Sequence, residues 1–480
     1  MATSAIWKAD WSLTSWKEKL IKTGAKVVSH GRYVPSWPRA GGRLDVVIAD
    51  GGRETWLVRF DKNGVCSSPK TRDALLDNLS ANKGRPVLFF SHGWNNDFAD
   101  AVDLYRRFLF EFEKVLAAHP IAGISPIFVG VTWPSIWLPS DAGPQMAAGN
   151  GEPKAVSDEA VLRELADILP VETDWSRLYA LLEAERISRD EAHELAGLIA
   201  PALRPNEEGG PREAAASEAN IVRAMAEMQR ADGEPPPDDD IDAIGVVGGS
   251  GGDDLTAAGL LGFLDPRPAL RLASLYLMKD RPGKVCANGV AALLREMLQR
   301  SAAPIHAIGH SFGGKVMLSA MAAEPKPGRR FKSMLLLQPA VSHLSFATSV
   351  PGRDGPGGYR NVLERVERPI FSTYSANDFP LHSIYHLALL RRKDLGEAQI
   401  AAVGTKAGNP PNAYAALGGY GPRGTDESLI DPIPKPGEKF NYPNTARLVG
   451  LDGSLDLRID SHGGVANPYT AWALHAQMAH

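Results

Sequence analysis

The chain has 480 residues, of which 44% are hydrophobic and 22% are charged, and its net charge at pH 7 is −4. This length allows two or three domains, or one large α/β domain with insertions, and the composition is typical of a globular protein with a buried core. The small negative charge gives no general electrostatic field for binding nucleic acid or an anionic membrane, which argues against both partners.

Residues 1–43 form an N-terminal extension before the first predicted strand. The first residues contain no apolar signal-peptide core, and no window of the chain approaches the length of a membrane-spanning helix. The two cysteines, Cys66 and Cys286, do not make a disulfide framework and favour a reducing compartment. We therefore expect a cytoplasmic protein without stable membrane association. Residues Leu13–Val34 resemble the C-terminal tail of certain bacterial insertion-sequence transposases, but this short match includes none of a transposase's catalytic carboxylates and implies no DNA chemistry.

Residues 44–140 alternate between strand and helix patterns. Two β-like runs, Leu44–Ala49 and Thr55–Phe60, flank a Gly-Gly turn, and a helix is predicted over Thr71–Asn82. The short apolar runs Pro86–Phe90 and Ile127–Trp133 are typical of strands that are buried on both faces. Between them Asn96 or Asp97 can cap a helix whose apolar residues recur at helical spacing, namely Leu104, Phe108, Phe112 and Val115. This order predicts a mostly parallel, doubly wound sheet.

Residues 141–280 differ from the regions on either side. Polar amphipathic helices are predicted here between Gly-, Pro- and Asp-rich stretches, over Ser157–Leu169, Asp174–Glu185, Arg189–Ile199 and Glu213–Arg230. The pattern indicates a helical insertion that covers the sheet as a cap.

Residues 281–480 return to the alternating pattern and complete the predicted core. Helices are expected over Ala287–Arg300, Phe312–Ala323 and Trp472–Met478. Strands are expected over Pro304–Gly309, Lys332–Gln338, Pro369–Ser375 and Leu455–Ile459.

Two serines stand in the pattern G-x-S-x-G, the sequence form of a nucleophile elbow. Ser250 lies among four glycines after a run of prolines and aspartates, so its surroundings favour a flexible loop over a strained turn. Ser311 follows an apolar strand and precedes a helix, with Gly309 and Gly313 where side chains would collide across a tight turn. Ser311 is therefore the candidate nucleophile.

A serine nucleophile needs a base, an acid that orients the base, and donors for an oxyanion. Asp378 follows a late strand, and His462 follows the last predicted strand, so both are expected at the carboxyl edge of the sheet. The backbone N–H groups of Trp94 and Phe312 are the candidate oxyanion donors. Asp460 is the rival acid, although its closeness to His462 in sequence makes contact with Nδ1 awkward.

The remaining histidines fit other roles better. His306 belongs inside the elbow strand, and His382 and His386 share a helical spacing. His310 is too near Ser311 in sequence to serve as its base. We place His310 with His92, Trp133 and Trp137 as candidate pocket residues, because these follow strand ends on the side where α/β sheets bind ligands.

With these residues in place, the chain resembles the α/β-hydrolase superfamily, in which the catalytic order is serine, acid, histidine. It looks most like bacterial members of unknown function that carry H-G-[YW]-N with a following phenylalanine, and then W-P-S. Here these are the His92–Asn95 segment with Phe98, and the Trp133–Ser135 segment. The resemblance covers roughly residues 44–140 and 281–480, and the large helical insertion departs from it.

The resemblance implies acyl transfer through an acyl-enzyme on Ser311, with carboxylic esters of small molecules as the expected substrates and no metal or other cofactor. An amidase, thioesterase or acyltransferase would use the same three residues. A catalytically silent hydrolase fold that serves as a binding module is the alternative from another class of protein. An intact set of Ser311, Asp378 and His462 favours an enzyme.

Overall fold

The computed structural model describes residues 46–49, 53–81, 84–94, 96, 98–135, 169–203, 264–323, 328–350, 355–385 and 415–479, together with residues 218, 219, 221, 222, 225 and 226. The N-terminal extension with its transposase-like segment lies outside these residues, as do Ser250, Trp137 and His386. Much of the predicted insertion also lies outside them.

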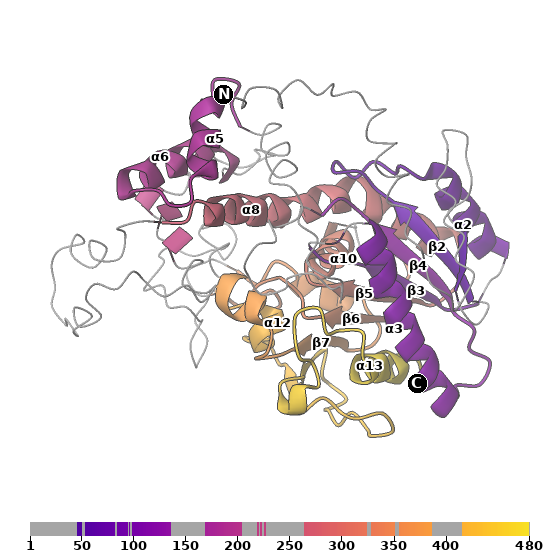
Figure 1. The fold of residues 1–480 in the computed structure, drawn as a ribbon. Helices are drawn as coiled ribbons and strands as arrows, with labels where there is room; N and C mark the ends of the chain where they lie inside the picture. The colour runs from indigo at the N-terminus through magenta and orange to yellow at the C-terminus, as the bar shows by residue number, and fades with distance from the viewer. Residues whose placement is uncertain are drawn as a thin grey trace.

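One sheet of nine strands forms the centre of the described part of the chain (Figure 1). The strands are β1 (Val46–Ala49), β2 (Arg53–Arg59), β3 (Val87–Ser91), β4 (Ile127–Thr132), β5 (Ile305–His310), β6 (Ser333–Leu337), β7 (Ile370–Tyr374), β8 (Ser428–Ile430) and β9 (Leu448–Asp452). Their order is β1-β2-β4-β3-β5-β6-β7-β9-β8. All pairs are parallel except β1 with β2, which confirms the α/β class and the mostly parallel sheet.

Helices cover both faces of this sheet, as the apolar strand sequences require. In β3, Phe89 packs in the hydrophobic cluster of one face, and Leu88 and Phe90 pack in the cluster of the other. The first face carries α2 (Pro69–Ala81), α9 (Ala291–Arg300) and α10 (Phe312–Ala323), with α8 (Arg267–Val285) packed on α10. The second face carries α3 (Phe98–Ala118) and α13 (Pro468–Met478), which lie side by side (Figure 1).

The last strand is not where the sequence predicted it, over Leu455–Ile459. Leu455–Leu457 forms a 3₁₀ turn instead of a strand, and the final strand in sequence is β9. The true strand contains Gly450, which lowers strand propensity. A Cβ at Gly450 would lie 2.7 Å from Leu429 Cδ2 of β8 and 2.8 Å from Pro422 Cδ, so glycine suits this crowded position.

The helix expected over Ala287–Arg300 begins much earlier. α8 continues through a π-helical turn, Cys286–Val290, directly into α9. The predicted domain boundary between residues 280 and 281 therefore falls inside a continuous helical segment. Gly289 lies in this turn, and a Cβ there would lie 2.3 Å from the Gly64 carbonyl oxygen, so this close approach favours glycine.

Within the predicted insertion, the described residues are mainly helical. Two helices, α5 (Trp175–Glu183) and α6 (Arg189–Ile199), lead into a 3₁₀ turn at Ala200–Leu203, and α6 contacts α8. Ser188 begins α6 with a capping box in which Glu191 is the partner. No helix in the described part of the chain is long and apolar enough to cross a membrane.

Helix α3 allows a direct test of which face it buries. Phe108 is fully buried against the sheet, and Phe110 on the same helix is 59% exposed. We expect Phe108→Ala to lower the free energy of unfolding by about 3–5 kcal/mol, because it removes the aromatic ring and leaves a cavity. Phe110→Ala should change it by less than about 0.5 kcal/mol. Urea unfolding of both variants measures this, and equal losses would contradict the assignment of the buried face.

Candidate active site

Ser311 occupies a strained turn between β5 and α10. Its φ is +55°, a left-handed conformation that costs a non-glycine residue free energy, and it is 1% exposed. The Ser311 N–H donates to the Leu337 carbonyl oxygen at the end of β6. The backbone on either side is crowded as expected, since a Cβ at Gly309 would lie 2.6 Å from Gly314 Cα, and one at Gly313 would lie 2.1 Å from the Ser91 oxygen. The geometry is that of a nucleophile elbow.

A chain of two hydrogen bonds joins Ser311, His462 and Asp378. Ser311 Oγ lies 2.8 Å from His462 Nε2, and His462 Nδ1 lies 2.8 Å from Asp378 Oδ2. All three side chains are at most 2% exposed. Because a carboxylate only accepts hydrogen bonds, Nδ1 carries the proton, and Nε2 is left to accept from the serine hydroxyl.

The loops that carry Asp378 and His462 are fastened to each other. Ser375 Oγ, just after β7, donates to the Ile459 carbonyl oxygen at 2.8 Å. The Asn377 side-chain amide donates to the carbonyl oxygens of Ser454 and Ile459 at 3.1 and 3.2 Å. Hydrogen bonds from side chains to backbone carbonyl oxygens therefore hold the two loops together, in addition to the bond between Asp378 and His462.

Asp460, the rival acid, is directed elsewhere. It is exposed and accepts a hydrogen bond from the adjacent Ser461 hydroxyl at 2.8 Å. Its carboxylate packs against the Cα of Gly464, where a Cβ would lie 2.0 Å from Oδ1. The structure brings Asp378, and not Asp460, into contact with His462.

The loop after β3 lies directly against Ser311. A Cβ at Gly93 would lie 2.5 Å from Ser311 Cβ, so only glycine permits this approach. The carbonyl oxygens of Gly93 and Trp94 both accept from the Asn96 side-chain amide, at 3.2 and 2.7 Å. Within the described residues, the backbone N–H groups of Trp94 and Phe312 donate to no other group. Both N–H groups belong to segments that meet at Ser311, where an oxyanion site would need donors.

His92 is a structural part of this loop. Its Nδ1–H donates to the Gly93 carbonyl oxygen at 2.8 Å, and its Nε2 accepts from the Trp133 N–H at 3.2 Å. The His92 and Trp133 rings stack with centroids 5.3 Å apart. The bonds of the His92 ring show that it supports this loop, and its place in a ligand pocket stays a prediction.

The sequence offered Asn96 as a candidate helix cap and Ser135 as part of the W-P-S motif, but it did not predict the contact between them. The Asn96 N–H donates to Ser135 Oγ at 2.9 Å, and the Ser135 hydroxyl donates back to the Asn96 carbonyl oxygen at 2.5 Å. This reciprocal pair joins the loop after β3 to the segment after β4. In the structure, the serine of the Trp133–Ser135 motif makes the contact that joins these two segments.

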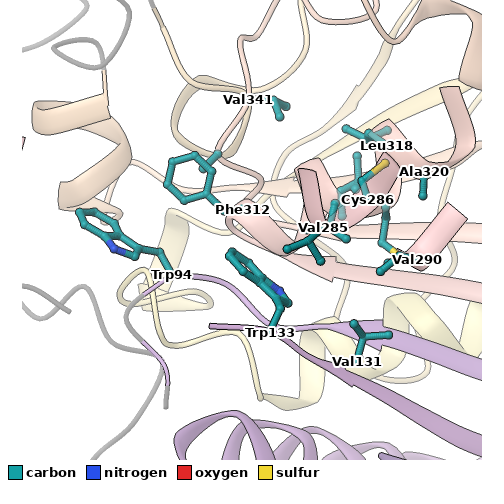
Figure 2. Close-up of a cluster of buried hydrophobic side chains, with 14 of the residues drawn as sticks. Trp94, Val131, Trp133, Val285, Cys286, Val290, Phe312, Leu318, Ala320 and Val341 are labelled. Atoms are coloured by element: carbon teal, nitrogen blue, oxygen red, sulfur yellow. The ribbon is translucent and has the colours of Figure 1, made fainter. Parts of the chain in front are cut away.

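Apolar side chains gather beside the elbow (Figure 2). Trp94 meets Phe312 edge to face with ring centroids 6.1 Å apart, and Trp133 and Val341 belong to the same buried cluster. Among the described residues the indole N–H of Trp94 has no hydrogen-bond partner.

His310 lies behind the imidazole of His462. Its Nε2–H donates to the His462 carbonyl oxygen at 2.8 Å, and burial lowers the pKa of His310 well below its ordinary value. The ring is therefore neutral at pH 7. His310 holds the backbone of His462 through this bond, and its place in a ligand pocket stays a prediction.

No model of a known protein family, no curated protein and no solved structure matches the chain. Among the described residues, no group of three His, Cys, Asp or Glu side chains is placed to hold a metal ion. The geometry of the site is therefore the evidence for its chemistry.

The crowding at Gly313 gives a testable contrast with its neighbour. Gly313→Ala would drive a methyl group into two backbone oxygens, at 2.1 Å from Ser91 and 2.3 Å from His92. We expect it to lower the free energy of unfolding by at least about 2 kcal/mol. Gly314→Ala meets only the Pro339 side chain, at 3.1 Å, and should stay within about 1 kcal/mol of wild type. If the two variants have similar free energies of unfolding in chemical denaturation, the turn at Ser311 is packed less tightly than these distances imply.

Proposed function

We propose that this protein is a serine hydrolase of the α/β-hydrolase type that cleaves carboxylic esters. The observation that carries the proposal is the buried relay in which His462 lies 2.8 Å from both Ser311 Oγ and Asp378 Oδ2. The strained turn at Ser311, the parallel sheet and the order serine, aspartate, histidine along the chain support it.

The first step is attack on the ester carbonyl. His462 Nε2 accepts the Ser311 hydroxyl proton as Oγ bonds to the carbonyl carbon, and Asp378 stabilises the resulting imidazolium. The carbonyl oxygen becomes an oxyanion and takes hydrogen bonds from the Trp94 and Phe312 N–H groups. These donors are fixed before the reaction, so no reorganisation is needed when the charge develops.

The second step releases the alcohol and restores the enzyme. His462 returns its proton to the departing alkoxide oxygen, which leaves an acyl group on Ser311 Oγ. Water then gives a proton to His462 and attacks the acyl carbonyl, and collapse of this intermediate frees the acid and the serine.

In this proposal, residues 141–280 cover the carboxyl edge of the sheet as a helical cap and shape access to Ser311. The continuous passage from α8 through the π-helical turn into α9 supports a rigid connection between the insertion and the core. The contact of α8 with α10, the helix that follows Ser311, places part of this connection beside the elbow helix.

The choice of nucleophile is tested by two serine substitutions. Ser311→Ala should abolish both hydrolysis of nitrophenyl esters and covalent labelling by a fluorophosphonate, because no other group can take the acyl or phosphonyl bond. Ser250→Ala should leave both near wild type. A panel of esters of rising chain length reports acyl preference in the same assay. A folded wild-type protein that neither labels nor turns over any ester would point to a silent binding module.

The acid is tested by two aspartate substitutions. Asp378→Asn should lower kcat by about 10³- to 10⁴-fold, because an amide N–H facing Nδ1 forces the imidazole proton onto the nitrogen next to Ser311. Asp460→Asn should leave kcat near wild type, since that carboxylate is exposed and bonded to Ser461. Circular dichroism controls for folding. A crippled Asp460 variant beside an active Asp378 variant would reverse the assignment.

A further inference from the structure

Gln338 contacts the carboxylate of Asp378 and is not explained by the mechanism above. Its Nε2 lies 2.8 Å from Asp378 Oδ2, the same oxygen that accepts from His462 Nδ1. Because a carboxylate has no proton to give, the Gln338 atom that faces it is the amide nitrogen. The side chain is fully buried, so water cannot replace it.

The carboxylate of Asp378 is held from two directions. Oδ1 accepts the Leu381 N–H at 3.0 Å, and Oδ2 accepts from Gln338 and His462. The Leu381 donor belongs to the same turn as Asp378, whereas Gln338 comes from the end of a different strand. Gln338 is therefore the contact that fixes the carboxylate relative to the rest of the sheet.

The backbone of Gln338 is strained to make this contact. Its φ is +42°, a left-handed conformation that is uncommon for residues other than glycine. The Gln338 N–H donates to Thr373 Oγ1 at 3.0 Å, and Gly418 packs so closely that a Cβ there would lie 2.3 Å from the Gln338 carbonyl carbon. Among the described residues the Gln338 side-chain oxygen has no hydrogen-bond partner, and the side-chain nitrogen bonds to Asp378.

We propose that Gln338 is a positioning residue that locks the Asp378 carboxylate in the orientation that meets His462 Nδ1. This inference rests on the proposed function. Gln338 touches no reacting atom and acts through Asp378. The titratable groups around it are Asp378, His462 and, behind the imidazole, His310.

The test measures the rate of fluorophosphonate labelling of Ser311 against pH, because labelling needs no knowledge of the natural substrate. Gln338→Met keeps the length of the side chain but removes the donor, and should slow labelling by roughly tenfold, the order expected for a lost hydrogen bond to a charged group. The control is Gln477→Met. Gln477 is also buried, but its amide donates to the Met334 and Pro369 carbonyl oxygens, away from Asp378.

Gln338→Glu separates positioning from a general effect on packing. A protonated glutamic acid can still donate to Asp378, but an ionised one places a second negative charge against it. We expect the rate of Ser311 labelling in this variant to fall at alkaline pH. The rates of wild type and Gln477→Met should level off there. This readout also decides the matter if Gln338→Met does not fold.

Two results would overturn the inference while leaving the proposed function intact. One is labelling of a folded Gln338→Met at the wild-type rate. The other is a Gln338→Glu profile that parallels wild type at every pH. A wild-type protein that is not labelled at all would overturn the proposed function, and the role of Gln338 with it.

Discussion

The arrangement of the site depends on one steric constraint, the close approach of three backbone segments around Ser311. The turn after β5, the loop after β3 and the start of α10 meet where Gly93, Gly309 and Gly313 leave no room for a Cβ. The contacts of Gly309 and Gly313 are with backbone atoms, and the closest contact of Gly93 is with the Ser311 Cβ, so these contacts hardly yield. This packing surrounds the left-handed turn of Ser311 and brings the segments that carry the Trp94 and Phe312 N–H groups together.

A second group of contacts holds the polar side chains of the site. These come from the strands that lie on the opposite side of β5 from β3. The loops after β6, β7 and β9 supply Gln338, Asp378 and His462, and each loop is bonded to at least one of the others. These loops come from neighbouring strands, so the parallel sheet brings their ends to one edge. The buried carboxylate is acceptable because donors surround it. Backbone packing therefore holds Ser311 in place, and hydrogen bonds hold Asp378 and His462.

Much of this arrangement could be predicted from the sequence, because its strongest signals are local. Short apolar runs mark the central strands, and the glycines beside Ser311 mark the elbow. What escaped prediction depends on contacts between distant segments. Gly450 is crowded by Leu429 of β8 and by Pro422, and Gly289 in the π-helical turn meets the turn at Gly64. The bonds of Gln338 to Asp378 and of Asn96 to Ser135 likewise join residues far apart in sequence.

The bond from His310 to the His462 carbonyl oxygen has a mechanical consequence. β5 and β9 are separated in the sheet by β6 and β7, so small movements of these strands would change the gap between serine and imidazole. His310 adjoins Ser311 in the chain and grips the backbone of His462 directly. This bond ties the elbow to the imidazole loop directly, in addition to the path through β6 and β7.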